Sequence, residues 1–226
     1  MNASQLKILA SVIMVVDHIG AVFFPSILIL RVIGRIAFPI YAFLIVEGYM
    51  HTSNVHKYWI RLGIFALISE IPFDYCFSHT IVNWAAQNIF FTLCEGVLML
   101  LLFERLHKVK PFLAYISPLI FMIINILIHG DYSYVGILII LGFYLWREKP
   151  QIAWGWIPAV QIIQMTEIFF VTGKVFVGNL IQMAQILALP FIMSYNGQRG
   201  RPWKYFFYAF YPGHLLLFGL IYQVIM

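Results

Sequence analysis

Apolar runs of about 20 residues follow one another along the whole chain, and no polar stretch between them is long enough to form a soluble module. A helix of about 20 apolar residues crosses the hydrocarbon core of a membrane, because it rises about 1.5 Å per residue. Only 10% of the residues are charged, against about 25% in a typical soluble domain. The sequence therefore predicts an all-α fold, a polytopic integral membrane helical bundle that forms a single domain over residues 1–226.

We expect about nine transmembrane helices, with eight or ten as open alternatives. The sixth apolar run is short, and the boundary around residues 172–174 is the weakest. We do not expect the first run to be a cleavable signal peptide, because it lacks an A-x-A-like site and contains Asp17 and His18. The expected spans are approximately residues 6–24, 31–50, 58–77, 87–103, 112–128, 133–146, 152–171, 175–194 and 204–225.

Basic residues are distributed unevenly over the connections between these spans. Eleven of the 14 lie at the N-terminus or in alternate connections, namely Lys7, Lys57, Arg61, Arg105, Lys108, Lys110, Arg147, Lys149, Arg199, Arg201 and Lys204. The other three are Arg31, Arg35 and Lys174. Because basic loops stay in the cytoplasm, we expect a multi-pass plasma-membrane protein with a cytoplasmic N-terminus and an outer C-terminus.

The first apolar run carries an acid and an imidazole side by side, Asp17 and His18. Ionisable groups at that depth are costly and are rarely kept without a use. Lys7 lies eleven positions before His18, which is close to three helical turns or roughly 16 Å. The two side chains therefore share one helix face, an arrangement that suits a long ligand with a charged end at the interface and a reactive end inside.

The expected topology gathers polar side chains of several spans in one slab, from mid-membrane to the outer surface. His214, about ten residues into the last span, lies at nearly the depth of His18. The other members of the slab are Asp17, Arg31, Arg35, Glu70, Asp74, Asn88, Thr92, Asp131 and Tyr132. We expect the functional site in this slab.

An imidazole in this setting can act as a general base on an amine or hydroxyl nucleophile. His18 is the favoured catalytic candidate, with His214 as the second. An acid partner would stabilise the imidazolium, but neighbouring residues on a helix point about 100° apart, so Asp17 need not reach His18. The partner acid is left open between Asp17, Glu70 and Asp74.

A structural role for the charged residues is an equal alternative. Arg31 and Arg35 are spaced i,i+4, as are Glu70 and Asp74, so the two pairs could hold the second and third spans together. Asp17 could instead pair with Arg35. We expect structural roles for the isolated acids Glu47 and Glu95.

Several function classes are excluded by the motifs that are missing. The sequence contains no serine elbow, no HExxH and no P-loop, which argues against membrane serine proteases, zinc proteases and nucleotide-driven pumps. Its two cysteines have no metal-site spacing, and there is no basic and aromatic patch for nucleic acid. We therefore expect neither a metal nor a nucleic acid partner.

Five separated stretches of the chain together resemble one known family. They are LKILASVIMVVDHIGAVFFP, LRVIGRIAFPIYAFLIVEGY, RLGIFALISEIPFDY, NIFFTL and NGQRGRPWKYFFYAFYPGHLLLF. In this order they resemble the TraX family, whose founding member acetylates the N-terminus of a conjugative pilin. That family is similar in turn to the acyltransferase-3 group, in which a basic residue, ten intervening positions and a catalytic histidine lie on an early helix. Lys7 and His18 fit this spacing.

The resemblance implies an acyltransferase of a bacterial plasma membrane that uses acetyl-CoA or another acyl-CoA. Lys7, Arg199 and Arg201 would hold the CoA phosphates from the cytoplasm, with Lys204 beside them. The acceptor would be extracytoplasmic, such as a pilin-like N-terminus, a glycan or another envelope molecule. Remaining candidates for substrate binding are Arg31, Arg35, Asp74, Asn88, Asp131 and Tyr132.

Some alternatives stay open. His18 could act as the base or form a transient acyl-imidazole. The acceptor, the acyl length and the oligomeric state are not determined. A small transporter or channel is the second hypothesis for function, with the charged slab as its pathway. The pairing of Lys7 and His18 and the basic residues on the cytoplasmic side separate the two hypotheses, because a transporter does not need a site for CoA phosphates.

Overall fold

The computed structural model describes residues 1–225, except for the side chains of Pro150 and Lys204. This part of the chain is all-helical and contains no strand, as the sequence predicts. The α-helices are α1 (Ala3–Val22), α2 (Leu28–Gly34), α3 (Ala37–His51), α4 (Val55–Ser78), α5 (Ile89–Val109), α6 (Ile116–Leu127), α7 (Ser133–Leu145), α8 (Ala153–Thr172), α9 (Val177–Gln182), α10 (Leu189–Met193) and α11 (Lys204–Ile225). Short 3-10 helices are η1 (Pro111–Tyr115), η2 (Pro150–Ile152) and η3 (Met183–Ala188).

Each expected span falls on one helix or on two or three consecutive helices. By length and composition, Ala3–Val22, Leu28–His51 and Tyr205–Ile225 can cross a membrane within the described residues. Pro111–Leu127, Ser133–Leu145 and Val177–Met193 are apolar but shorter. Several apolar helices are therefore present, and the number of spans stays a prediction.

The second expected span is broken into α2 and α3 at Arg35 and Ile36. Pro39 lies in the first turn of α3. Proline has no N–H to donate to the carbonyl four residues earlier, here that of Arg35, and its ring would clash with that carbonyl. The break therefore comes one turn before the proline and sets Arg35 at the junction of the two helices.

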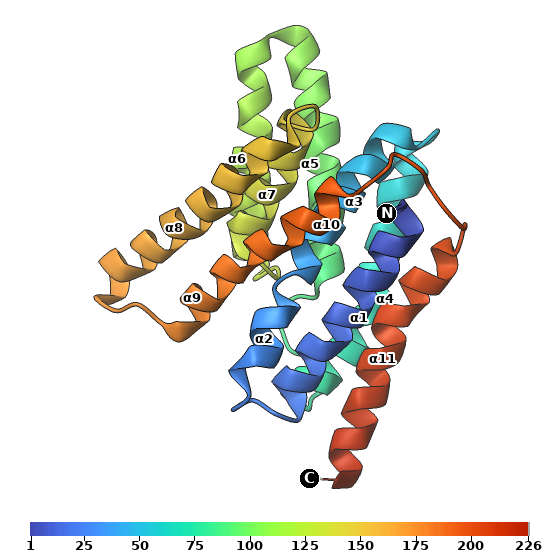
Figure 1. Ribbon diagram of the computed structural model, residues 1–226, viewed down its shortest axis with the longest axis vertical. Coiled ribbons are helices and arrows are strands. Elements are labelled where there is room, and N and C mark those ends of the chain that lie inside the picture. The colour runs from blue at the N-terminus through green and yellow to red at the C-terminus, as the bar shows by residue number, and fades with distance from the viewer. Residues whose placement is uncertain (226) are drawn as a thin grey trace.

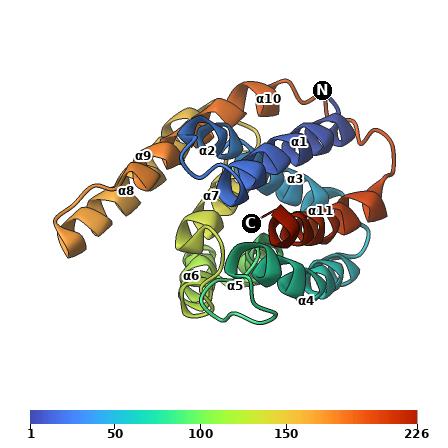
Figure 2. The same ribbon diagram turned by 90° about the horizontal axis from the view of Figure 1, so that it is seen from below.

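The first and last helices lie side by side and run in the same direction (Figures 1 and 2). Helix α11 packs mainly on α4 and also contacts α1, while α2 folds back on α1. Residues such as Leu6, Ile40, Leu100, Ile137 and Leu215 are fully buried in the apolar core between these helices. Helices α8 and α9 project from the bundle as a separate arm (Figure 1).

A strap formed by residues 194–203 crosses the N-terminus of α1. Ser4 Oγ donates to the carbonyls of Arg199 at 3.1 Å and Arg201 at 2.6 Å, and the Ala3 amide donates to Gln198 O at 2.8 Å. Gly200 has φ +71° there, and a Cβ at this position would lie 2.5 Å from Asn2 Oδ1. The strap thus holds the start of α11 beside the start of α1.

Candidate active site

A cavity of about 200 Å³ lies between the C-terminal half of α1, helices α2 and α3, α4, α11 and the loop before α7. It is lined by Met14, Asp17, His18, Arg31, Gly34, Arg35, Ala37, Phe38, Tyr41, Phe73, Phe77, Ile89, Asp131, Tyr132 and Tyr211. Six of these residues were predicted site residues from three different parts of the sequence: Asp17, His18, Arg31, Arg35, Asp131 and Tyr132.

Two arginines hold one carboxylate at the cavity wall. Arg31 Nη1 lies 2.9 Å from Asp17 Oδ1 and donates to Asp17 O at 2.9 Å. Arg35 Nη2 lies 2.7 Å and 3.0 Å from the two carboxylate oxygens of Asp17. Gly34 permits this approach, because a Cβ there would lie 2.0 Å from Asp17 Oδ1. Asp17 is therefore bound on both oxygens and braces α1 against α2.

The proposed pairing of Arg31 and Arg35 with Glu70 and Asp74 is wrong, and the alternative of Asp17 with Arg35 is confirmed. The reason is that α2 packs on α1, whereas matched depth leaves open which neighbouring helix supplies the acid.

Glu70 and Asp74 make different contacts, which tie α4 to the segment that enters α5. Glu70 Oε2 accepts a hydrogen bond from Asn88 Nδ2, and Asp74 Oδ2 accepts one from the Asn83 amide at 2.6 Å. Asn88 also donates to Ala66 O at 2.8 Å and caps α5 through Phe90 N at 3.0 Å. Within the described residues these side chains lie outside the cavity lining, so their geometry fits a structural role.

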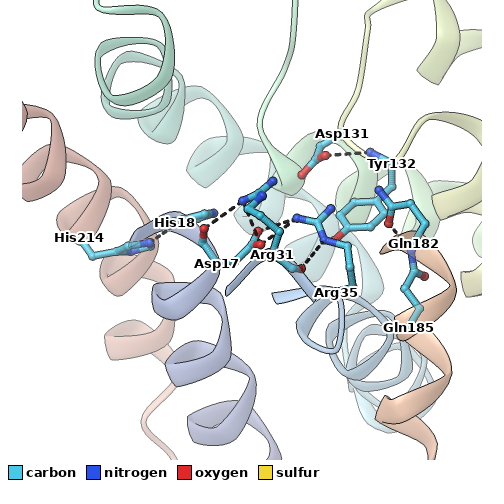
Figure 3. A network of polar contacts seen from close by, with 9 residues as sticks. All are labelled: Asp17, His18, Arg31, Arg35, Asp131, Tyr132, Gln182, Gln185 and His214. Atoms are coloured by element: carbon cyan, nitrogen blue, oxygen red, sulfur yellow. Dashed lines mark hydrogen bonds and ion pairs between the residues drawn. The ribbon is translucent and has the colours of Figure 1, made fainter. Parts of the chain in front are cut away.

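The two histidines at matched depth meet. His18 Nδ1 lies 2.8 Å from His214 Nε2, and the two rings are nearly parallel at 6° with centroids 5.0 Å apart. The rings of His18 and Phe77 also lie in an edge-to-face arrangement, with centroids 5.3 Å apart. Figure 3 shows His18 between His214 and the cluster of Asp17 and Arg31. One imidazole thus reaches the cavity while a second lies behind it.

The opposite wall of the cavity is formed by Asp131 and Tyr132, in the loop between α6 and α7. The Tyr132 ring stacks on Phe38 with centroids 3.8 Å apart, and the Arg35 guanidinium lies 5.8 Å from its centroid. Asp131 Oδ1 accepts a hydrogen bond from the Tyr132 amide at 3.0 Å. An aromatic ring and a carboxylate therefore face the imidazole across the cavity.

This loop has an unusual backbone. His129, Tyr132 and Ser133 all have positive φ, at 55°, 63° and 49°. Such conformations are costly for residues other than glycine and often mark functional sites. The loop is held by Gln87, whose amide donates to His129 O at 2.9 Å, and by Thr92 Oγ1, which donates to Asp131 O at 2.5 Å. The contacts fix Asp131 and Tyr132 against the cavity.

The predicted CoA-binding residues lie at the other end of α1. Lys7 Nζ lies 5.8 Å from the ring centroid of Phe207 in α11, so Lys7 and His18 both face α11. They therefore share one face of α1, as the helical spacing predicts. Arg199 and Arg201 belong to the strap. Lys204 was predicted to join them, but its side chain lies outside the described residues.

The two isolated acids make local contacts. Glu95 Oε2 accepts a hydrogen bond from Asn125 Nδ2 in the interior, and Glu47 lies 3.7 Å from His51 at the end of α3. Both contacts fit the structural roles predicted for these acids.

Sequence reasoning missed Gly34 and Tyr211 in the cavity wall. Tyr211 lies three residues before His214, and therefore on the same face of α11, which was a usable signal. Gly34 gave no such signal, because its importance depends on a contact with Asp17 that only the fold shows.

A comparison with models of protein families shows to which family this chain is related. The model of the family described as TraX protein matches residues 2–222. The chain belongs to the TraX family. TraX proteins are linked to pilin acetylation in general, and family membership together with the apolar helices indicates a membrane protein.

Two curated proteins are similar to this TraX-family chain. One, described as "Probable fimbrial assembly protein FimC, serogroup H1" from Dichelobacter nodosus, is 28% identical over 229 residues, or 96% of this chain and 93% of that protein. The other, "Uncharacterized protein RP591" from Rickettsia prowazekii (strain Madrid E), is 33% identical over 89 residues, or 39% of this chain and 34% of that protein. No solved structure matches.

Proposed function

We propose that this protein is a polytopic membrane acyltransferase that moves an acetyl or other acyl group from cytoplasmic acyl-CoA to an extracytoplasmic acceptor. The observation that supports the proposal best is the position of His18 at the cavity wall, backed by His214 at 2.8 Å. A base in this place can take the proton of an amine or hydroxyl as that group attacks a thioester carbonyl.

In the proposed reaction the acceptor nitrogen or oxygen forms a bond to the acyl carbon, and the carbon–sulfur bond breaks. His18 takes the proton from the nucleophile and returns it to the departing CoA sulfur. Arg31 lies beside His18 at the cavity and uses Nη1 on Asp17, so the rest of its guanidinium can stabilise the negative charge that develops on the carbonyl oxygen. The acceptor would enter along Asp131 and Tyr132.

The donor would bind along the seam between α1 and α11. Lys7, Arg199 and Arg201 supply positive charge at one end of this seam, and His18 lies at the other, roughly 16 Å further along α1. This separation matches the extended arm of an acyl-CoA. With a cytoplasmic N-terminus, the phosphates would remain on the cytoplasmic side while the acyl group reached the cavity.

The relative from Dichelobacter nodosus is described as a probable fimbrial assembly protein, which favours a pilin-like acceptor. The decisive experiment incubates the purified protein in nanodiscs with radiolabelled acetyl-CoA and with membranes from a strain that lacks the gene. We expect label on an envelope component and release of free CoA. Mass spectrometry of the labelled component distinguishes a peptide amine from a glycan.

His18→Ala should lower transfer by about 10²–10⁴-fold without unfolding the protein, the usual contribution of a general base. His51→Ala is the matched control, because the His51 side chain is 73% exposed and contacts Glu47 instead of the cavity. Near-normal transfer by His18→Ala, or no acyl transfer by the wild-type protein, would refute the proposed function.

A further inference from the structure

A chain of two hydrogen bonds runs from the backbone of α11 to the cavity. His214 Nδ1 lies 2.7 Å from Phe210 O, and His214 Nε2 lies 2.8 Å from His18 Nδ1. A carbonyl oxygen only accepts, so His214 Nδ1 must carry a hydrogen and donate it. A neutral imidazole carries one N–H, which leaves a lone pair on His214 Nε2.

The direction of the second bond follows from the first. Because His214 Nε2 accepts, His18 Nδ1 must donate, and the lone pair of neutral His18 lies on its Nε2. Figure 3 shows that His214 and the cluster of Asp17 and Arg31 lie on opposite sides of the His18 ring. The free nitrogen of His18 is therefore the one on the side away from His214, where the cavity lies.

The charges around the pair favour this neutral arrangement. The carboxylate of α1, that of Asp17, is occupied by Arg31 and Arg35, and two guanidinium groups disfavour a further positive charge beside them. Among the described side chains, the recorded hydrogen bonds of the two imidazoles involve each other and Phe210 O, with no carboxylate.

We infer that His214 is a positioning residue that fixes His18 as the Nδ1–H tautomer and leaves His18 Nε2 as the basic atom in the cavity. A neutral imidazole thus takes the place that a carboxylate has in many histidine-dependent acyl transfers. Its catalytic consequence rests on the proposed function, whereas the tautomer itself does not.

The arrangement also accounts for the return of the proton. When His18 Nε2 accepts the proton of the nucleophile, the resulting imidazolium still donates from Nδ1 to His214 Nε2. No carboxylate holds that charge, so the proton on Nε2 passes readily to the sulfur that leaves as the carbon–sulfur bond breaks. His214 keeps its own proton on Nδ1 throughout, because Phe210 O accepts it and cannot be protonated in turn.

The first test measures the tautomer directly. The full-length protein, labelled with ¹⁵N in its seven histidines, is examined by solid-state NMR in lipid bilayers, with the His18 signals assigned by their loss in His18→Gln. Protonated and unprotonated ring nitrogens have well-separated shifts. We expect a protonated Nδ1 and an unprotonated Nε2 in His18. Protonation of His18 at Nε2 instead would overturn the inference.

The second test separates positioning from packing. His214→Gln can place an amide oxygen near His18 Nδ1 and keep the acceptor, whereas His214→Leu removes it. We expect His214→Leu to lower kcat by about 10–100-fold, the usual range for an orienting partner, with the KM for acetyl-CoA unchanged and with a loss of the single His18 tautomer. His214→Gln should retain much more of kcat and the Nδ1–H signal.

His51→Leu is the control for loss of an imidazole elsewhere. Equal losses of kcat in His214→Leu and His214→Gln, with the His18 tautomer unchanged in both, would overturn the positioning role. If the wild-type protein transfers no acyl group, the proposed function fails, while the NMR result still decides how His214 orients His18.

Discussion

Asp17 is bound by the guanidinium groups of Arg31 and Arg35, so its negative charge and their positive charges compensate one another. The side chains of Asp17 and Arg35 are 11% and 10% exposed, and that of Arg31 is 30% exposed. Removing one member of a buried ion pair is far more harmful than removing both, because the remaining charge stays without compensation. The cluster therefore lends itself to a double-mutant cycle.

Replacing Asp17 with alanine should lower the free energy of unfolding by about 3–5 kcal/mol, since two guanidinium groups lose their carboxylate. Adding Arg35→Met should recover part of this loss, which thermal unfolding in detergent can measure. Glu148→Ala is the control: its side chain is 85% exposed and lies 3.7 Å from Arg147, so a change below about 1 kcal/mol is expected. A double mutant no more stable than Asp17→Ala would show that charge balance is not the cause.

Gly34 provides a second test at the scale of single residues. The Cβ of Gly34→Ala would overlap the Asp17 carboxylate, at 2.0 Å from Oδ1. We expect a loss of about 1–3 kcal/mol, typical of overpacking, together with reduced acyl transfer because Asp17 and its arginines must shift. Gly155→Ala in α8 is the matched control, because no described heavy atom lies within 4 Å of its added Cβ. Equal stability of the two variants would contradict the close contact.

Helices α1 and α11 form the element on which the proposed chemistry depends. Lys7 and His18 contact α11 at Phe207 and His214, respectively, so a single seam joins the strap to the cavity. The strap in turn keeps the two helices together at their N-terminal ends through Ser4.

Lys7→Gln should raise the KM for acetyl-CoA and leave kcat nearly unchanged, because Lys7 would contact only the phosphates. The effect should shrink as salt is added, because Lys7 is only partly buried and interactions between charges near water are screened over about 10 Å at 0.1 M ionic strength. Lys57→Gln, near the start of α4, is the control and should alter neither parameter. A fall in kcat with an unchanged KM would argue against the seam as the donor site.

The sequence predicted where the helices lie better than it predicted which helices are neighbours. The apolar runs located the helices, and the eleven-residue spacing predicted that Lys7 and His18 share one face of α1, which in the structure is the face toward α11. The break before Pro39 was not placed at Arg35, although the physical cause lay in the sequence. The partner of Arg31 could not be found in this way, because depth along a helix says nothing about which neighbour it faces.

At the scale of the whole molecule, the prediction concerns orientation in the membrane. The distribution of basic residues predicts that reporter fusions after Lys57, Lys108 and Arg201 read as cytoplasmic, and that fusions at Ser78 and Asp131 read as external. Alkaline phosphatase and fluorescent-protein fusions give opposite signals on the two sides. A cytoplasmic reading at Asp131 would place the cavity on the wrong side for an extracytoplasmic acceptor.

The contact between His18 and His214 joins positions 196 residues apart. His18 lies in α1 and His214 in α11, so the pair cannot form until α11 has been synthesised and inserted beside α1. Every shorter nascent chain lacks the second imidazole. Under the proposed function, a chain that stops before α11 would therefore lack the residue that orients His18, however well its preceding helices have folded.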